Sequence, residues 1–241
     1  MKVSHKHKYV FVELPQTASS AVGLELIENY NAENFMAKHA LYREFAKRSS
    51  DKEKDYFVFS AVRDPMDVVV SKYMKYKNDH HNYSKKKKKY MNARLDKLIS
   101  PIRERRRHKW IQKNNASFGD FFLKYYKRPY SNWSIVEHKD FDFIMRFEKI
   151  QDDFNTVLEK IGLRPVRPLP VRNKTEEKSK AHSYFNTIEL QKHAKYVFGP
   201  YMRFWNYDFP EEWSSIKEPE NAQKDFERIN KLRSIFWKYF H

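Results

Sequence analysis

The chain has 241 residues, 40% of them hydrophobic and 17% aromatic, which is enough for a sizeable core in one large domain or two small ones. It contains no cysteine, which excludes a disulfide framework or a thiolate metal site, and its net charge of +17 favours anionic partners. No segment approaches the roughly 18 apolar residues of a membrane span. The apolar run 9–14 is too short for a signal-peptide core. We therefore expect a soluble, cytoplasmic protein, or a trimmed form of an anchored one.

Predicted strands and helices alternate along most of the chain. The strands are recognised as short, nearly continuous apolar runs, and the helices as apolar positions at helical spacing. One helix start is well marked, because Asp64 suits the cap, Pro65 the first helical position and Asp67 the first turn. In chain order we predict a strand at 9–14, a helix at 21–29, a strand at 34–38, a helix at 40–47, a strand at 56–62, helices at 65–74 and 118–125, a strand at 141–147, and helices at 150–161 and 219–240.

This alternation predicts an α/β sandwich with a central, mainly parallel sheet. No Gly/Ser/Pro-rich linker interrupts the chain, so we expect one domain over 1–241. A basic insertion occupies about 77–114, where 14 Lys and Arg face three acidic residues. Its apolar residues at 91–102 keep helical spacing, which predicts that part of it folds as helix. A solvated charge run is the alternative interpretation.

A polar loop follows the first predicted strand. Residues 15–20, Pro-Gln-Thr-Ala-Ser-Ser, open a helix at the edge of the sheet where α/β folds bind ligands. Free N–H groups at a helix start suit a phosphate or sulfate, and Thr17, Ser19 and Ser20 add hydroxyl donors. Simple helix capping is the alternative. The loop lacks both the glycines and the lysine of a kinase P-loop, which disfavours a kinase.

A second candidate anion site follows the third predicted strand. Arg63 offers a rigid charged fork for a phosphate, and Ser71 lies two helical turns further on. Alternatively, Arg63 pairs with Asp64 or Asp67 and Ser71 is ordinary helix surface. Together, the two loops match a donor with a phosphosulfate on one side and a phosphate on the other. 3′-Phosphoadenosine 5′-phosphosulfate (PAPS) is the common nucleotide with both groups.

Four blocks of the sequence resemble the PAPS-dependent sulfotransferases, in the same order. PQTASS at 15–20 is similar to the family's phosphosulfate loop and RDPMDVVVS at 63–71 to its 3′-phosphate motif. RFEKIQDDF at 146–154 and LPVRNK at 169–174 match later blocks less specifically. The resemblance implies a P-loop-NTPase-like three-layer fold, PAPS as donor and adenosine 3′,5′-bisphosphate as product. The donor-binding residues that it implies are Gln16, Thr17, Ala18, Ser19, Ser20, Arg63, Ser71, Asn173 and Lys174.

The resemblance also implies an acceptor and a general base. Lys38 and His39 look like the "K-H" motif of carbohydrate sulfotransferases, in some of which the histidine takes the proton of the acceptor hydroxyl. We therefore expect a carbohydrate or other hydroxyl acceptor. A histidine that only packs or caps is the alternative.

Gln16 departs from the family pattern, because most members have lysine there to stabilise charge on the leaving phosphate. Losing one such electrostatic contact typically costs about 10²–10³ in rate. Lys38 or Lys174 could fill the role, and we list Gln16 and Lys38 with His39 as candidate catalytic residues. A slow enzyme and a nucleotide-binding homologue without turnover are the alternatives. No metal-ligand cluster is visible in the sequence, so we expect activity without metal.

A basic nucleic-acid-binding protein is the rival interpretation. Positive charge comes from Lys85–Lys89, Arg103 and Arg105–Arg107, and Tyr83, Tyr90 and Trp110 are candidate stacking groups. No recognised nucleic-acid fold motif accompanies them, so we disfavour this interpretation. The same basic stretch could instead hold an acidic or already sulfated acceptor.

Overall fold

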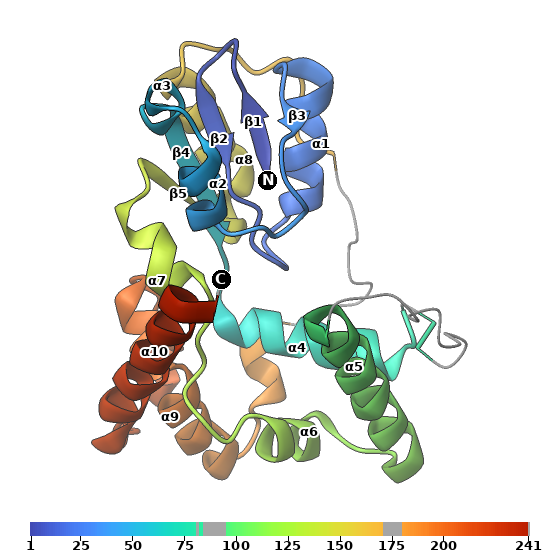
Figure 1. Cartoon of the computed structure of the whole chain (residues 1–241). Helices are drawn as coiled ribbons and strands as arrows, with labels where there is room; N and C mark the ends of the chain where they lie inside the picture. The colour runs from blue at the N-terminus through green and yellow to red at the C-terminus, as the bar shows by residue number, and fades with distance from the viewer. Residues whose placement is uncertain (81, 84–94, 171–179, 241) are drawn as a thin grey trace. The chain divides into compact units, whose positions relative to one another are not determined.

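The structure is a computed structural model that describes residues 1–80, 82–83, 95–170 and 180–240. The chain divides into two compact units (Figure 1). The first unit comprises residues 1–64, 131–174 and 227–241, and the second comprises residues 65–130 and 175–226. Three of the four blocks that carry the predicted site belong to the first unit, and the block 63–71 begins in the first unit and continues into the second.

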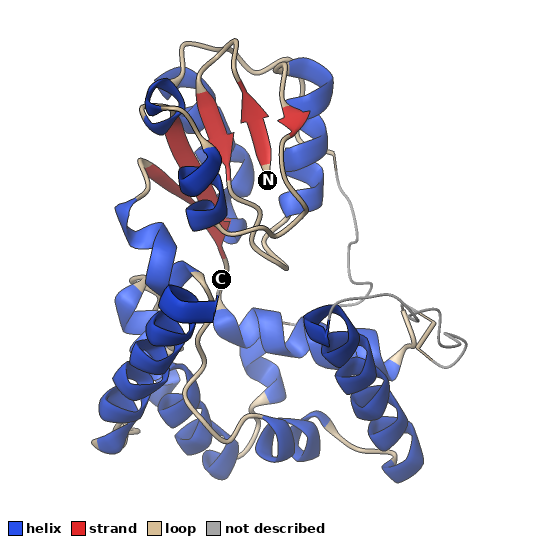
Figure 2. Cartoon of the chain, in the orientation of Figure 1, coloured by secondary structure: helices blue, strands red, loops and turns tan. Residues whose placement is uncertain are grey.

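A five-stranded mixed sheet forms the centre of the first unit (Figure 2). The strand order is β3-β1-β2-β4-β5, in which β2, β4 and β5 run parallel, while β1 runs antiparallel to both β2 and β3. The parallel strands therefore end at one common edge. The strands are β1 (Lys2–Ser4), β2 (Tyr9–Phe11), β3 (Glu33–Asn34), β4 (Phe57–Val62) and β5 (Phe143–Arg146).

Helices cover both faces of this sheet. Tyr9 and Phe11 of β2 pack with α1 (Ser19–Asn29) and α8 (Ile150–Lys160) on one face. Val10 and Val12 pack on the other face with the side of α2 (Tyr42–Arg48). Successive strand residues thus meet different helical layers, which explains why the strands are apolar throughout rather than alternating. The three layers and the α/β class confirm the predicted fold class, with a sheet that is partly parallel.

Shorter elements and part of a long helix complete the first unit. Most of the short helices lie between strands in the chain, η2 follows the last strand, and α10 begins in the second unit and continues into the first from Glu227 on. These elements are α3 (Asp51–Lys54), α7 (Ser134–Glu137), the 3₁₀ helices η1 (His138–Asp140) and η2 (Phe147–Lys149), and α10 (Asn221–Phe240).

The described part of the second unit is helical and has an aromatic core. Phe122 stacks on Phe118 and Phe198, and Phe185 meets all three of these rings. The basic insertion is helical from residue 95 on, as its apolar spacing predicted. The elements of this unit are α4 (Pro65–Lys77), α5 (Leu95–Asn114), α6 (Phe118–Tyr125), η3 (Ala181–Tyr184), α9 (Ile188–Phe204) and η4 (Glu211–Trp213).

Several short elements, among them α3 and α7, were not predicted, and three other differences from the sequence prediction are more informative. The strand expected at 34–38 is shorter and lies at Glu33–Asn34, where it pairs with β1. The antiparallel strand β1 was not predicted, because its three residues carry no clear apolar run. The 17-residue helix α9 was also missed, since Pro200 lies inside it and proline normally interrupts a helix.

Candidate functional site

The loop Pro15–Ser20 leaves the carboxyl end of β2 and turns sharply into α1. Gln16 and Ala18 both have left-handed backbone conformations, with φ of 72° and 58°. Such a conformation costs roughly 1–2 kcal/mol for a residue with a Cβ atom. Two strained residues in one short loop indicate that the loop's shape serves a purpose beyond connecting two elements.

The strained turn presents a row of backbone donors. The carbonyl of Ala18 accepts hydrogen bonds from Ala21 and Val22, which closes the first turn of α1. Within the described ranges, no group accepts a hydrogen bond from the backbone N–H groups of residues 17–20. The buried Thr17 hydroxyl donates to the carbonyl of Leu14 at 2.9 Å, so it holds the loop rather than facing outward. The start of α1 is therefore a ready site for an anion.

Lys38 brings a positive charge to this loop from a different segment. Its ammonium group donates to the Ser20 hydroxyl over 2.6 Å. Gln16 itself brings no charge, and its buried side-chain oxygen receives no hydrogen bond from any described residue. Position 16 therefore brings no positive charge to the start of α1, and Lys38 brings one from a different segment of the chain.

His39 lies beside the same loop in a defined orientation. Its Nδ1 atom is 2.9 Å from the main-chain carbonyl oxygen of Glu13. A carbonyl oxygen can only accept, so Nδ1 carries the proton and Nε2 keeps a free lone pair. Partial burial lowers the pKa of His39, and the charge of Lys38 adds to that lowering. The imidazole is therefore neutral near pH 7 and can accept a proton at Nε2.

Arg63 connects the loops that follow β2 and β4. Its Nη1 atom donates to the main-chain oxygen of Gln16 over 3.1 Å. The guanidinium lies over the ring of Phe147, 3.9 Å from the ring centre. Glu148 accepts a hydrogen bond from the backbone N–H of Asp64 at 2.9 Å. The turn after β5 therefore supports the turn after β4, and the three parallel strands build one site at their common edge.

A model of the sulfotransferase family matches residues 1–209, which include the whole of this site. The chain belongs to the sulfotransferase family. This is a family of PAPS-dependent transferases, so the donor is PAPS. No curated protein and no solved structure matched the chain. Among the helices that the structure describes, none is long and apolar enough to cross a membrane.

Of the other predicted residues of this sulfotransferase, Ser19 is the buried first residue of α1 in the first unit, and three lie outside that unit or outside the described ranges. Ser71 lies in α4 of the second unit, where its side chain is buried. Asn173 and Lys174 lie outside the described residues, and their assignment stays a prediction. The structure therefore brings together Gln16, Ser20, Lys38, His39 and Arg63 in one unit.

Two residues of the sulfotransferase site were missed as individual contributors. Phe147 and Glu148 belong to the third of the four sequence blocks, 146–154, but the sequence alone did not predict a role for either residue. In the structure, the ring of Phe147 packs against the guanidinium of Arg63. The carboxylate of Glu148 accepts the N–H of Asp64 and so holds the turn that follows β4. Their position at the carboxyl end of a predicted strand was the available signal, because such positions face the ligand edge of an α/β sheet.

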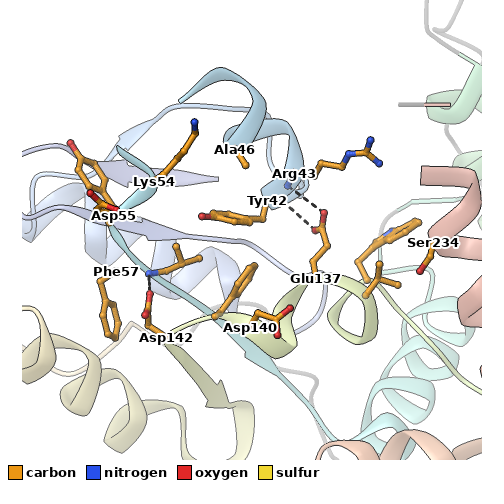
Figure 3. Close-up of a pocket in the computed structure, with 15 residues that line it drawn as sticks. Tyr42, Arg43, Ala46, Lys54, Asp55, Phe57, Glu137, Asp140, Asp142 and Ser234 are labelled. Atoms are coloured by element: carbon orange, nitrogen blue, oxygen red, sulfur yellow. Dashed lines mark hydrogen bonds between the residues drawn. The ribbon is translucent and has the colours of Figure 1, made fainter. Parts of the chain in front are cut away.

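A cavity of about 750 Å³ lies at the opposite end of β4 (Figure 3). Phe57 and Val58, the first residues of β4, line it, whereas Arg63 follows the last. Glu137 in its wall accepts the backbone N–H groups of Tyr42 and Arg43 at 3.2 and 3.3 Å. Its carboxylate thereby caps α2, the helix that directly follows Lys38 and His39 in the chain.

Proposed function

We propose that this sulfotransferase transfers the sulfuryl group of PAPS to a hydroxyl group of a carbohydrate. The observation that carries the proposal is the hydrogen bond from Arg63 to Gln16, because it joins the two loops whose sequences resemble the family's donor-binding motifs. The family model covers residues 1–209 and so includes parts of both compact units. We therefore propose that the two units act as one sulfotransferase domain.

The residues present suit an anionic donor. In our assignment the backbone N–H groups of residues 17–20 hold the phosphosulfate, and Arg63 with Ser71 holds the 3′-phosphate. The free N–H groups at the start of α1 and the two nearby cations support this assignment. Asn173 and Lys174 complete the assigned donor site. When bound, PAPS supplies the sulfuryl group and adenosine 3′,5′-bisphosphate remains as product.

His39 is assigned as the general base. The carbonyl of Glu13 holds the imidazole so that Nε2 is free to receive the proton of the acceptor hydroxyl. The lowered pKa keeps the imidazole in its neutral, proton-accepting form. An acceptor oxygen that loses its proton to Nε2 is the stronger nucleophile toward sulfur.

Lys38 is assigned to the electrostatic task that lysine at position 16 performs in most of the family. Its contact with Ser20 supports this assignment, because it fixes the ammonium group at the start of α1. Charge that develops on the leaving phosphate is stabilised by such a preorganised cation. Gln16 adds an uncharged donor beside it. A metal requirement is not part of this proposal.

The nucleic-acid alternative loses support from two of its stacking groups. The side chain of Tyr83 is only 4% exposed, so its ring faces cannot receive bases. Trp110 is covered by Lys124, whose ammonium lies 4.8 Å from the ring centre, and it meets Tyr125 edge to face. Tyr90 and residues 85–89 lie outside the described ranges.

Calorimetry with adenosine 3′,5′-bisphosphate tests the donor site. Arg63→Ala should weaken binding by about 1.5–3 kcal/mol, the range for a charge-assisted hydrogen bond. Arg48→Ala removes an exposed arginine in the same unit and should leave binding unchanged. Equal affinities for wild type and Arg63→Ala would remove Arg63 from the site.

A transfer screen with labelled PAPS tests the acceptor class. Glycans, steroids and phenols are offered in parallel, with and without a chelator. Label transfer to glycans is the expected result. Transfer to steroids or phenols alone would overturn the carbohydrate assignment. Transfer to none of them would support the alternative that the protein binds the nucleotide without turnover.

A further inference from the structure

A cluster of basic side chains lies between two packed helices of the second unit. Lys72 and Tyr76 are four residues apart on α4, and Arg103 and Arg107 are four residues apart on α5, so each pair shares one helix face. The two helices pack against each other (Figure 1). Tyr76 of α4 belongs to the same hydrophobic core as Ile111 of α5. We call Lys72, Arg103 and Arg107 the α4–α5 cluster.

Aromatic rings hold the guanidinium of Arg107 in place. The charge of Arg107 also acts on the Tyr76 hydroxyl, where it opposes the rise in pKa that burial causes. The guanidinium carbon of Arg107 lies 5.0 Å from the ring centre of Tyr125 and 6.0 Å from that of Tyr126. Its buried Nε atom donates to no group among the described residues. Arg107 is therefore a fixed, partly desolvated cation and not a freely moving surface side chain.

The charges of the cluster are not balanced by the acid within it. Burial lowers the pKa of Lys72 to about 8, and Arg107 and Arg103 lower it further, whereas Glu104 opposes them. Lys75, one turn along α4, also acts on Lys72 as a like charge. Like charges that share a partly buried site repel one another, and a bound anion would relieve that repulsion.

We infer that the α4–α5 cluster binds a sulfate or carboxylate group of an anionic glycan. This inference rests on the proposed function, because it makes the carbohydrate acceptor an acidic or already sulfated one. The held guanidinium of Arg107, the exposed guanidinium of Arg103 and the ammonium group of Lys72 suit a planar or tetrahedral oxyanion.

A glycan fits this site better than a nucleic acid. Single-stranded nucleic acids need ring faces on which bases can stack. Tyr76, at the centre of the cluster, is 4% exposed, and Arg107 occupies the space over Tyr125 and Tyr126. The cluster therefore offers charge without a stacking platform, which matches a sugar that carries sulfate or carboxylate groups.

The test is direct binding without donor. A fluorescently labelled, sulfated hexasaccharide is titrated with wild type and with the double variant Arg103→Gln/Arg107→Gln. The variant should lose about 10-fold or more in affinity, because each charge-assisted contact is worth at least that much. The control Arg106→Gln/Lys109→Gln removes the same charge from exposed positions of the same helix and should change affinity less than the cluster variant does.

Three results would overturn the inference. The first is an equal loss in both double variants, which would indicate unspecific attraction by net charge. The second is an unlabelled, uncharged hexasaccharide that competes as well as a sulfated one. The third is a single-stranded DNA of equal charge that binds more tightly and with the same sensitivity to Arg103 and Arg107. Arg103→Gln alone, at an exposed position, keeps the test valid if the double variant does not fold.

A pH titration adds a readout that a structural role would not change. Lys72 faces Arg103, Glu104 and Arg107 from α5, and Lys75 and Tyr76 from its own helix. Glycan affinity should fall as the pH rises above about 8, because Lys72 loses its proton there in the protein without bound glycan. Lys72→Arg should abolish this decline, because arginine stays charged. A decline that persists in Lys72→Arg would contradict the inference.

Adenosine 3′,5′-bisphosphate binding separates this inference from the proposed function. All variants of the cluster should bind this nucleotide as wild type does. Glycan binding without any sulfuryl transfer would leave the cluster assignment standing and refute the proposed function. Sulfuryl transfer to glycans, with no effect of the cluster variants on glycan affinity, would support the proposed function and refute the cluster assignment.

Discussion

The ammonium nitrogen of Lys38 lies 2.6 Å from the hydroxyl oxygen of Ser20, at the first turn of α1. This contact links two segments that are far apart in the sequence, since 18 residues separate them. It gives the loop a fixed cation although position 16 holds glutamine. The expected behaviour of variants at positions 38 and 16 follows directly from it.

Lys38→Met should lower kcat by about 10²–10³, because one preorganised charge is lost from the leaving-group side. Adding Gln16→Lys to Lys38→Met should recover much of this loss, since it restores the charge from the position used by most of the family. Single-turnover measurements with labelled PAPS provide the readout. A Lys38→Met enzyme with wild-type kcat would assign the task to another cation.

The acid limb of the pH profile of kcat/KM should have its midpoint below the ordinary histidine value of 6.5. Partial burial and the charge of Lys38 both lower the pKa of His39, and the base works only in its neutral form. Activity should therefore persist at pH values where an ordinary histidine would already be protonated. Lys38→Met should move the midpoint upward, because one of these two causes is removed. His39→Ala should abolish turnover and leave adenosine 3′,5′-bisphosphate binding intact.

Ala18→Gly should stabilise the folded protein by about 0.5–1 kcal/mol. Glycine adopts the left-handed conformation of residue 18 without the Cβ penalty, although its freer unfolded chain cancels part of the gain. Urea denaturation measures the change in the free energy of unfolding. Ala21→Gly, inside the right-handed helix α1, is the matched control and should destabilise by about 1 kcal/mol. The same sign in both variants would argue against backbone strain at Ala18.

His138 should make the first unit sensitive to acid. Its ring is buried and stacked on Phe141 with 4.6 Å between ring centres, and burial lowers its pKa to about 3. Between pH 3 and 6.5 the unfolded chain binds a proton at this residue that the folded chain does not. The free energy of unfolding should therefore fall with decreasing pH, by about 1.4 kcal/mol per unit from this residue.

The measurement for His138 is urea denaturation at several pH values between 4 and 7. His138→Phe keeps the stacked ring and removes the titration, so its stability should decline less toward low pH than that of wild type. Parallel pH curves for the two proteins would contradict the prediction. His182→Phe, which replaces a half-buried histidine of the second unit in the same way, serves as the control.

The strands and helices that could be predicted from the sequence are those with a strong local signal. Residues 9–12 and 57–62 are buried on both faces of the sheet, so their apolar character was continuous and easily recognised. The start of α4 at Pro65 was equally clear from its first residues. By contrast, β1 depends on pairing with β2 and β3, and no local pattern of three residues reveals such a pairing.

The candidate site was predictable in its members but not in its geometry. The motifs named Gln16, Lys38, His39 and Arg63. They could not show that Arg63 donates to Gln16, or that Lys38 reaches Ser20, because these contacts join segments distant in sequence. The left-handed conformations of Gln16, Ala18 and His39 were also hidden, since without glycine the sequence gives little sign of a positive φ.

The partner that orients His39 is a main-chain oxygen, not a side chain. In many catalytic arrangements a carboxylate orients the histidine, and a single substitution can remove it. Here the acceptor persists whatever residue occupies position 13, provided that the backbone keeps its path. Substitution at position 13 should therefore leave the tautomer of the base unchanged, whereas it should still alter the pKa of His39, because the charge of the Glu13 side chain acts to raise that pKa.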